Sequence, residues 1–301
     1  MTHGLIGVCG MGRMGAAIAH RLLSVGQPVM VWNRDPARCA PLVAAGASMA
    51  ATPADVTAAC DTVVSMLFDG PAVAAVYQGA QGLLSADAKG KLFIEMSTIG
   101  PEAIRAVAQA VQMAGADFIE CPVGGTVGPA RDGKLLGLVG GTPQALDRAR
   151  PILEHLCRRI EHAGPVGAGA QLKLAVNLPL LVYWQALGEA MGLVADLDMS
   201  ADQLADLMAD TSGSPVAIKH RSGELAAMLA GRGDPAVGFE ARGAEKDLRE
   251  MAQLSTALGL DAPVTRAAHD AFTAAVSGQI GGKDAMTIAA LNWRKARREP
   301  A

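Results

Sequence analysis

A glycine-rich turn near the start of the chain has the spacing of a phosphate-binding loop. It reads Gly10-Met11-Gly12-Arg13-Met14-Gly15, and it lies between an apolar run and a helical pattern. In such a turn the first glycine permits the tight bend, the second lets the main chain approach a pyrophosphate, and the third lets the helix pack on the sheet. The N–H groups that begin the helix then face the phosphates. These six residues are therefore predicted to bind a dinucleotide.

The residues after the second apolar run indicate which dinucleotide to expect. An NAD site usually places Asp or Glu there, bonded to the ribose 2′-hydroxyl, whereas this chain has Asn33 and Arg34. An arginine can bind a 2′-phosphate through a charge-assisted fork, and Arg13 would add positive charge. Asp35 is the competing ribose acid, but its place before a proline favours a helix cap. We therefore predict NADP(H) in preference to NAD(H), with Asn33 and Arg34 among the cofactor-binding residues.

Short apolar runs alternate with helical patterns through the first half of the chain, which is typical of βαβ units and a parallel sheet. Strands are expected at 5–9, 28–32, 62–67, 91–95, 117–121, 134–139 and 159–162, with helices at 13–25, 36–45, 53–59, 71–78, 101–114 and 143–156. After Gly164 the pattern is helical only, at 168–197, 200–210, 215–230, 240–259, 263–277 and 284–297. The fold prediction is an α/β Rossmann-type N-terminal domain with a mostly parallel sheet, residues 1–164. An all-α C-terminal domain for substrate binding and dimerisation, residues 165–301, follows and begins with a long interdomain helix.

Composition narrows the function classes. The chain has 301 residues, a net charge of -3 and 3% aromatic residues, which argues against nucleic-acid binding. Five widely spaced cysteines without a CxxC pair predict small buried side chains in a reducing compartment, the cytoplasm. The six histidines lack metal-ligand spacing, so no metal is expected.

The segment 174–197 is strongly apolar but carries Asn177, Glu189 and Asp196, which predicts a buried helix and no membrane span. Its apolar residues lie nearly all round the helix, so they need cover on every side. One small helical domain can hardly supply that cover. We therefore expect a homodimer or homotetramer.

Six ordered motifs carry a family resemblance over essentially the whole chain. They are IGVCGMGRMG at 6–15, VWNRDPARC at 31–39, EMSTIGP at 95–101, ECPVGGTVGPARDGKL at 120–135, GPVGAGAQLKLAVN at 164–177 and FEARGAEKDL at 239–248. With them the chain resembles the β-hydroxyacid dehydrogenases, which include 3-hydroxyisobutyrate dehydrogenase, tartronate semialdehyde reductase and glyoxylate/succinic semialdehyde reductase. The VWNR and KLAVN segments look most like the NADP-dependent semialdehyde reductase branch.

The resemblance implies a site. Lys173 matches the catalytic lysine, and Asn177 matches the asparagine one helical turn later that orients substrate. Cofactor contacts are implied for Met66, Leu67, Thr98 and Lys246, and substrate contacts for Gly124, Gly125, Thr126, Phe239 and Asp247. Many family members have serine where this chain has Gly124, which leaves main-chain N–H groups and Thr126 to hold a substrate carboxylate.

The chemistry implied for this site is hydride transfer between a nicotinamide and a small hydroxy- or oxo-acid substrate. The cofactor carries the hydride, and the protein must manage one proton. A lysine ammonium can stabilise the developing charge on a reduced carbonyl oxygen and protonate it. For the reverse oxidation the amine must be neutral, which requires a pKa below the free value of about 10.4, and partial burial would lower it. Because Lys173 and Asn177 are four residues apart on a predicted helix, they share a face.

For several residues, the residue type alone allows both a functional and a structural role. Lys246 and Asp247 lie among many charges on a predicted helix. Lys246 is either functional or an exposed charge, and Asp247 is either the partner of Lys246 or a surface carboxylate. Ser97 either caps the helix that begins at Pro101 or ends a strand, and it stays outside the predicted catalytic set. Two other functions remain open, an imine reductase, which needs no carboxylate clamp, and a non-catalytic dinucleotide-binding scaffold. Lys173 argues against the imine reductase, and the Lys173 and Asn177 pair argues against the scaffold.

Overall fold

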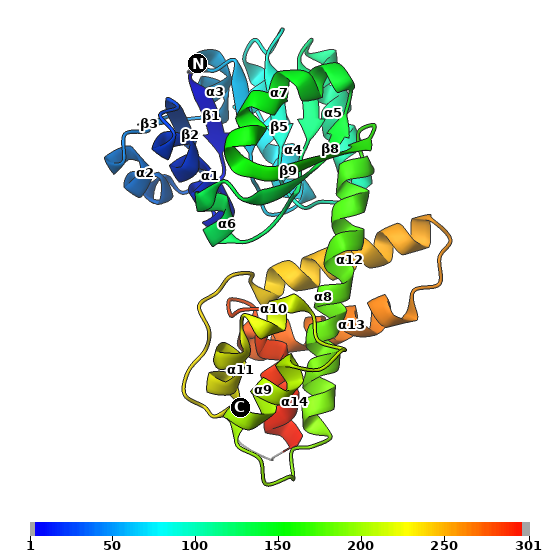
Figure 1. The fold of residues 1–301 in the computed structure, drawn as a ribbon. Coiled ribbons are helices and arrows are strands. Elements are labelled where there is room, and N and C mark those ends of the chain that lie inside the picture. Colours follow the sequence, from blue (N-terminus) through cyan, green and yellow to red (C-terminus); the bar gives the residue numbers. More distant parts are fainter. Residues whose placement is uncertain (1–3, 297–301) are drawn as a thin grey trace. The chain divides into compact units, whose positions relative to one another are not determined.

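The computed structural model describes residues 4–296 and divides into two compact units, one ending at Leu174 and one beginning at Ala175 (Figure 1). The first unit is built on a nine-stranded sheet in the order β3-β2-β1-β4-β5-β6-β8-β7, with β9 paired to β8. Its strands are β1 Ile6–Cys9, β2 Val29–Trp32, β3 Ser48–Met49, β4 Thr62–Ser65, β5 Leu92–Glu95, β6 Asp117–Glu120, β7 Val123–Gly124, β8 Leu135–Gly141 and β9 Cys157–Gly164. Among the strand pairs of the described residues, β6 with β8 and β7 with β8 are antiparallel, and the others are parallel. The predicted mostly parallel sheet is confirmed.

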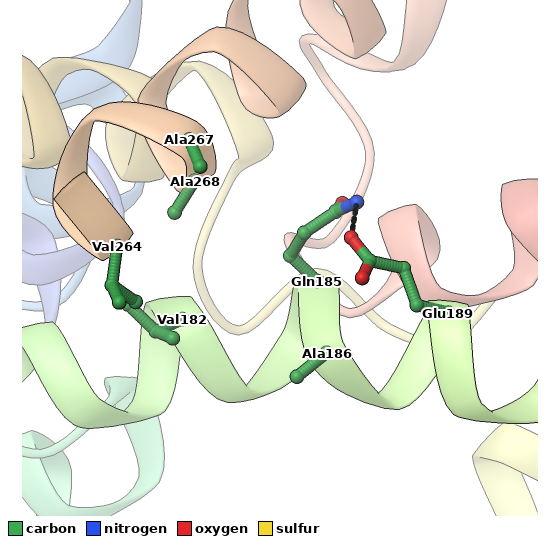
Figure 2. Close-up of a pocket in the computed structure, with 7 residues that line it drawn as sticks. All are labelled: Val182, Gln185, Ala186, Glu189, Val264, Ala267 and Ala268. Carbon is green, nitrogen blue, oxygen red and sulfur yellow. Dashed lines mark hydrogen bonds between the residues drawn. The ribbon is translucent and has the colours of Figure 1, made fainter.

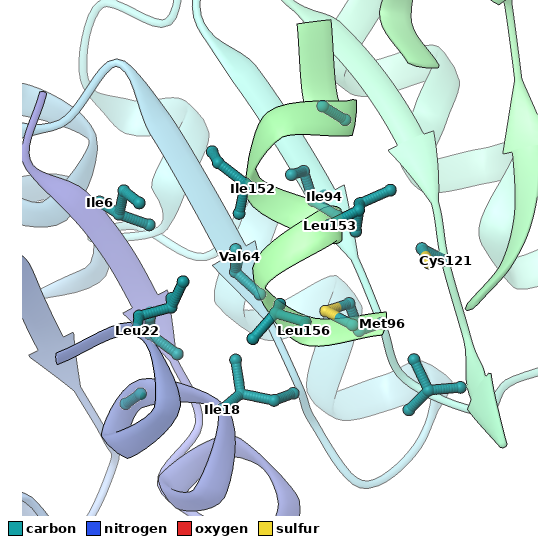
Figure 3. Packing of buried hydrophobic residues seen from close by; sticks show 14 of the residues in the cluster. Ile6, Ile18, Leu22, Val64, Ile94, Met96, Cys121, Ile152, Leu153 and Leu156 are labelled. Atoms are coloured by element: carbon teal, nitrogen blue, oxygen red, sulfur yellow. The ribbon is translucent and has the colours of Figure 1, made fainter. Parts of the chain in front are cut away.

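Helices cover both faces of this sheet. They are α1 Arg13–Ser24, η1 Pro36–Cys39, α2 Ala40–Ala44, α3 Pro53–Ala59, α4 Gly70–Gln78, η2 Leu83–Ser85, α5 Pro101–Met113, α6 Val127–Asp132 and α7 Pro143–Leu156. On one face α1 and α7 bury residues such as Ile18 and Leu153 against Val64 and Ile94 (Figure 3). On the other face α3, α4 and α5 pack with Tyr77, Phe93 and Phe118. Parallel strands buried on both faces explain the continuous apolar runs in the sequence.

The strand order reverses direction at β1. The chain runs from β1 to β2 and β3 on one side and then returns to place β4 on the other side of β1. In open α/β sheets, ligands bind outside the carboxyl ends of the strands at such a switch point. The glycine turn leaves β1 there, so the fold places it where a dinucleotide would bind.

The second unit is helical. The helix α8, Ala168–Gly192, begins in the first unit and continues into the second. It is followed by α9 Ala201–Ala209, α10 Val216–Lys219, α11 Ser222–Leu229, α12 Ala241–Ala257, α13 Pro263–Ala275, the π-helix η3 Val276–Ile280 and α14 Thr287–Ala296. Within residues 4–296, no strand follows β9, and the only extended pairing there is a bridge between Glu240 and Asp284. The predicted all-α second half is confirmed.

Some predicted bounds are wrong. The helix expected over 168–197 ends at Gly192, a residue type with low helix propensity. The helix expected over 215–230 is two helices, because Arg221 leaves helical geometry and bonds Glu224 and Asp284. The last helix begins at Thr287, not at 284, because the Asp284 carboxylate bonds main-chain N–H groups outside it. The short β3, β7 and α6 have too few residues to show a period.

All five cysteines are free and buried, as predicted. No helix in the described part of the chain has the length and apolarity needed to cross a bilayer.

Candidate active site

The glycine turn has the shape that a pyrophosphate requires. Gly10 has φ +98°, and a Cβ there would lie 2.3 Å from the Met66 carbonyl oxygen. A Cβ on Gly15 would lie 1.8 Å from the Gly10 carbonyl oxygen, so the turn and α1 are in direct contact. Around Gly12, by contrast, no atom would lie within 4 Å of a Cβ. Because space opens only at the middle glycine, beside the start of a twelve-residue helix, the turn fits a dinucleotide phosphate.

Asn33 ties the glycine turn to the end of β2. Its Oδ1 accepts a hydrogen bond from the Met11 N–H at 2.8 Å, and its Nδ2 donates to the Asp35 carbonyl oxygen at 2.8 Å. The Asp35 carboxylate accepts from the Ala37 N–H at 3.1 Å and lies 3.8 Å from the Arg38 guanidinium. The helix-cap interpretation of Asp35 is thus confirmed, although the capped element is the 3₁₀ helix η1. Arg34 follows β2 and Arg13 begins α1, and both are exposed.

The Met66–Leu67 segment leaves β4 beside the glycine turn. The Met66 N–H donates to the Cys9 carbonyl oxygen at 2.9 Å, and the Leu67 N–H donates to Ser97 Oγ at 2.7 Å. Ser97 follows β5, and its own N–H donates to Glu95 Oε1 at 2.7 Å. Both alternatives for Ser97 are therefore wrong, because it joins two loops, and Gly100 caps the helix at Pro101.

Glu95 is fully buried behind these loops. The Ser65 hydroxyl donates to its Oε2, and the Tyr77 hydroxyl lies 2.8 Å from Ser65 Oγ. Burial raises the pKa of Glu95 to about 7, against hydrogen bonds from Ser65, Ser97 and Tyr77 that lower it. The Glu95 carboxyl group thus supports two loops, the one that begins at Met66 after β4 and the one that contains Ser97 and Thr98 after β5. Thr98 is half-buried.

The predicted carboxylate-binding segment begins on β7 and enters α6. Gly124 is half-buried, while Gly125 and Thr126 are exposed. A Cβ at Gly124 would lie 3.4 Å from Leu136 Cβ, an ordinary contact, whereas Gly125 has φ +123°. Position 124 therefore has room for the serine of the family pattern, and position 125 requires glycine.

Lys173 lies on the second turn of α8 and is 7% exposed. The start of this helix is bound by Glu120, the last residue of β6. Glu120 Oε1 accepts from the N–H groups of Gly167 and, at 3.1 Å, Gly169, and its Oε2 accepts from the Ala170 N–H at 3.1 Å. Burial raises the pKa of Glu120 to about 7, while those three N–H groups and Arg105 lower it.

In the helical unit, three of the predicted residues meet. Asn177 Nδ2 donates to Asp247 Oδ2 at 3.1 Å, and Lys246 Nζ lies 2.7 Å from Asp247 Oδ1. Lys246 and Asp247 are 4% and 2% exposed, so the surface-charge alternative is wrong for both. Phe239 precedes α12 and packs on its first turn, where a Cβ on Gly243 would lie 2.9 Å from the ring.

The start of α12 is itself held by Asp284, which sequence reasoning missed. Asp284 is 1% exposed. Its Oδ2 accepts from the Gly238 and Phe239 N–H groups at 2.9 and 3.3 Å. Its Oδ1 accepts from Met286 N–H and Arg221 Nη1, both at 3.0 Å.

Glu95 and Glu120 were missed as well, although the sequence held a signal. Three neighbouring strands each end in a polar residue after two apolar ones, in TVVS, LFIE and DFIE. The register aligns Ser65 with Glu95 and Glu95 with Glu120. A polar residue repeated at the last position of buried strands indicates a buried polar row below the ligand edge of the sheet. Among the described residues, no group of three His, Cys, Asp or Glu side chains is placed to hold a metal.

Two family models together match most of the chain. Residues 5–164 match the NAD-binding domain of 6-phosphogluconate dehydrogenase. Residues 167–292 match the NAD-binding domain of NADP-dependent 3-hydroxyisobutyrate dehydrogenase. The glyoxylate/succinic semialdehyde reductase 1 of Arabidopsis thaliana is 33% identical over 279 residues, which cover 93% of this chain and 95% of that protein. The chain belongs to the 3-hydroxyisobutyrate dehydrogenase family.

Solved structures agree with this family. The 3-hydroxyisobutyrate dehydrogenase of Mycobacterium tuberculosis, solved with L-serine, has a TM-score of 0.82 at 28% identity and covers 96% of this chain and 98% of its own. An imine reductase of Streptomyces aurantiacus has a TM-score of 0.60 at 25% identity and covers 95% and 99%. As a member of the 3-hydroxyisobutyrate dehydrogenase family, the chain is a nicotinamide-dependent oxidoreductase acting on hydroxyl or carbonyl groups.

Proposed function

We propose that this enzyme uses NADP(H) to interconvert a small β-hydroxyacid and its semialdehyde, with Lys173 as the general acid and base. The observation that carries the proposal is that Lys173 is buried near the start of α8. Glu120 binds this helix start to the carboxyl end of the sheet that carries the glycine turn. An ammonium held there can protonate the oxygen of a reduced carbonyl, and the neutral amine can accept the hydroxyl proton in the reverse direction. The bound nicotinamide would supply or accept the hydride.

The remaining residues have supporting roles in this proposal. Asn177 orients the substrate oxygen, and its amide is held in turn by Asp247. Gly124, Gly125 and Thr126 hold the substrate carboxylate with main-chain N–H groups and one hydroxyl. Gly10 to Gly15, Met66, Leu67, Thr98 and Lys246 serve the cofactor, and Phe239 and Asp247 serve the substrate.

A substrate screen that follows NADPH consumption tests this proposal. It should contain glyoxylate, succinic, tartronate and methylmalonate semialdehydes and one cyclic imine, each with wild type and Lys173→Ala. We expect turnover of an aldehyde acid and a loss of about 10²–10⁴-fold in rate for the variant. Turnover of the imine alone would favour an imine reductase, and no turnover at all would favour a dinucleotide-binding scaffold.

The NADP(H) preference is proposed from the end of β2. Neither Asn33 nor Asp35 offers an uncommitted carboxylate for the ribose 2′-hydroxyl, because Asn33 is an amide and the Asp35 carboxylate caps η1. Arg34 is exposed and can pair with a 2′-phosphate. We expect Arg34→Ala to raise KM for NADPH much more than KM for NADH. A wild-type kcat/KM that favours NADH would overturn this preference.

We also propose a homodimer or homotetramer in the cytoplasm. The helix α8 leaves Val176 46% exposed, and α13 leaves Val264 59% exposed. A mostly apolar groove lies between these two helices, lined by Val182, Gln185, Ala186, Glu189, Val264, Ala267 and Ala268 (Figure 2). None of the predicted site residues lines it, and a second copy would cover it. The five buried thiols suit a reducing compartment. A species of ~31 kDa in sedimentation at micromolar concentration would contradict the oligomer.

A further inference from the structure

The start of α8, the helix that carries Lys173, is bound by a side chain from a distant strand. The first N–H groups of a helix have no partner inside it and need acceptors from elsewhere. A short side chain from the cap residue usually supplies one. Here position 167 is a glycine, and a carboxylate from β6 binds three of these groups at once, on Gly167, Gly169 and Ala170.

The main chain around Glu120 is shaped to let that carboxylate in. A Cβ at Gly140, the residue paired with Glu120 across the sheet, would lie 2.1 Å from Glu120 Oε1. A Cβ at Gly169 would lie 2.4 Å from the Leu138 carbonyl oxygen, so the helix touches β8 directly. Gly167 has φ +99°, and a Cβ there would lie 2.7 Å from the Arg105 guanidinium. Three glycines thus bring the helix, the strand and the carboxylate together.

Lys173 follows closely on this clamp. It is three residues after Ala170, which is a rise of roughly 4.5 Å along the helix. A shift or rotation of the first turn of α8 would therefore move the lysine amine by a similar amount. The Glu120 charge also opposes the positive end of the α8 dipole, at the helix start that precedes Lys173.

We propose that Glu120 is a positioning residue for Lys173. Its carboxylate fixes the first turn of α8 on the sheet and sets the charge at the helix start that precedes the lysine. The inference rests on the proposed role of Lys173 and extends it to a residue that touches neither substrate nor cofactor. Burial raises the pKa of Glu120 to about 7, while the three N–H groups and Arg105 from α5 lower it, so the carboxylate is charged above neutral pH.

The test compares Glu120→Gln and Glu120→Asp with wild type in the oligomer as purified. At pH 8 we expect Glu120→Gln to lower kcat by about 10-fold while KM for NADPH stays within about 2-fold, because the glycine turn leaves a different strand. Loss of the negative charge should also move the basic limb of the kcat/KM profile about half a pH unit lower. Glu120→Asp keeps the charge and should leave this limb at the wild-type position.

Thr142→Ala is the matched control. Thr142 caps α7 of the same unit by accepting from the Ala145 N–H at 3.2 Å, and it is not among the site residues. It should lower Tm without moving the pH limb. If Glu120→Gln behaves like this control, or raises KM for NADPH as much as it lowers kcat, the positioning role is wrong. If wild type itself turns over no aldehyde acid, the proposed function fails instead, which separates the two outcomes.

Discussion

The two units each use a buried carboxylate to hold the start of a helix that carries proposed site residues. Glu120 binds three N–H groups at the start of α8, before Lys173. Asp284 binds the N–H groups of Gly238 and Phe239, which precede the helix α12 that carries Lys246 and Asp247, and it also binds the Met286 N–H. The difference is the counter-charge, since Asp284 forms a direct ion pair with Arg221 at 3.0 Å. Glu120 has no such direct ion pair and relies on main-chain donors. Burial raises its pKa to about 7, although these donors and Arg105 lower it.

This difference predicts that loss of Asp284 costs more stability than loss of Glu120. Asp284→Ala leaves Arg221 without one partner and three main-chain N–H groups without an acceptor, which should cost about 3–5 kcal/mol. Calorimetry should show a larger fall in Tm than for Glu120→Gln. An equal or smaller fall would show that the ion pair adds nothing to the main-chain contacts.

Variants of the buried pair Lys246 and Asp247 test whether these two charges in the helical unit contribute to stability or to catalysis. Lys246→Ala removes the ammonium 2.7 Å from a carboxylate that is 2% exposed, at a cost of about 2–4 kcal/mol. The double variant Lys246→Met with Asp247→Leu should recover most of this loss in urea unfolding, yet stay inactive. Recovery of turnover in the double variant would contradict the proposed roles of both residues.

The two raised glutamate pKa values predict a pH dependence of stability in the first unit. Each folded pKa, about 7, is above the ordinary glutamate value of 4.5. The stabilisation is therefore complete below pH 4.5 and is lost as the pH rises through 7, on the order of 3 kcal/mol for each group. Wild-type Tm should fall between pH 5.5 and 8.5, and Glu95→Gln or Glu120→Gln should flatten the slope. Asp284→Asn is the comparison variant, and a wild-type Tm that rises over this range would contradict the prediction.

Gly124→Ser should have the smallest effect on stability. Its Cβ would make only an ordinary contact with Leu136, so Tm should change by about as little as a typical surface substitution, within ±0.5 kcal/mol. The added hydroxyl should lower KM for a carboxylate substrate and leave KM for NADPH unchanged. Gly125→Ser is the matched control, since φ +123° makes any side chain strained there. A Tm loss as large for position 124 as for position 125 would contradict this interpretation.

Sequence patterns predicted what depends on local order. The period of apolar residues placed the strands of the parallel sheet and the helices of the second unit, and the spacing of Gly10, Gly12 and Gly15 identified the tight turn after β1. The positions that sequence reasoning missed depend on long-range register. Glu120 contacts α8 some 47 to 50 residues later, and Asp284 contacts Gly238 at a separation of 46. Glu120 carries one local signal, its place at the end of a buried strand, but nothing local shows that it contacts α8. Nothing local to Asp284 distinguishes it from a surface charge.

Asn33 couples two properties that are usually treated as independent. One amide accepts from the glycine turn and donates to the turn after β2. Replacing it with aspartate, the simplest step toward a different nucleotide preference, keeps the acceptor but removes the donor. A substitution of Asn33 therefore alters the hydrogen bond to the glycine turn together with the proposed ribose contact. A switch of coenzyme in this chain would need a compensating change near Asp35.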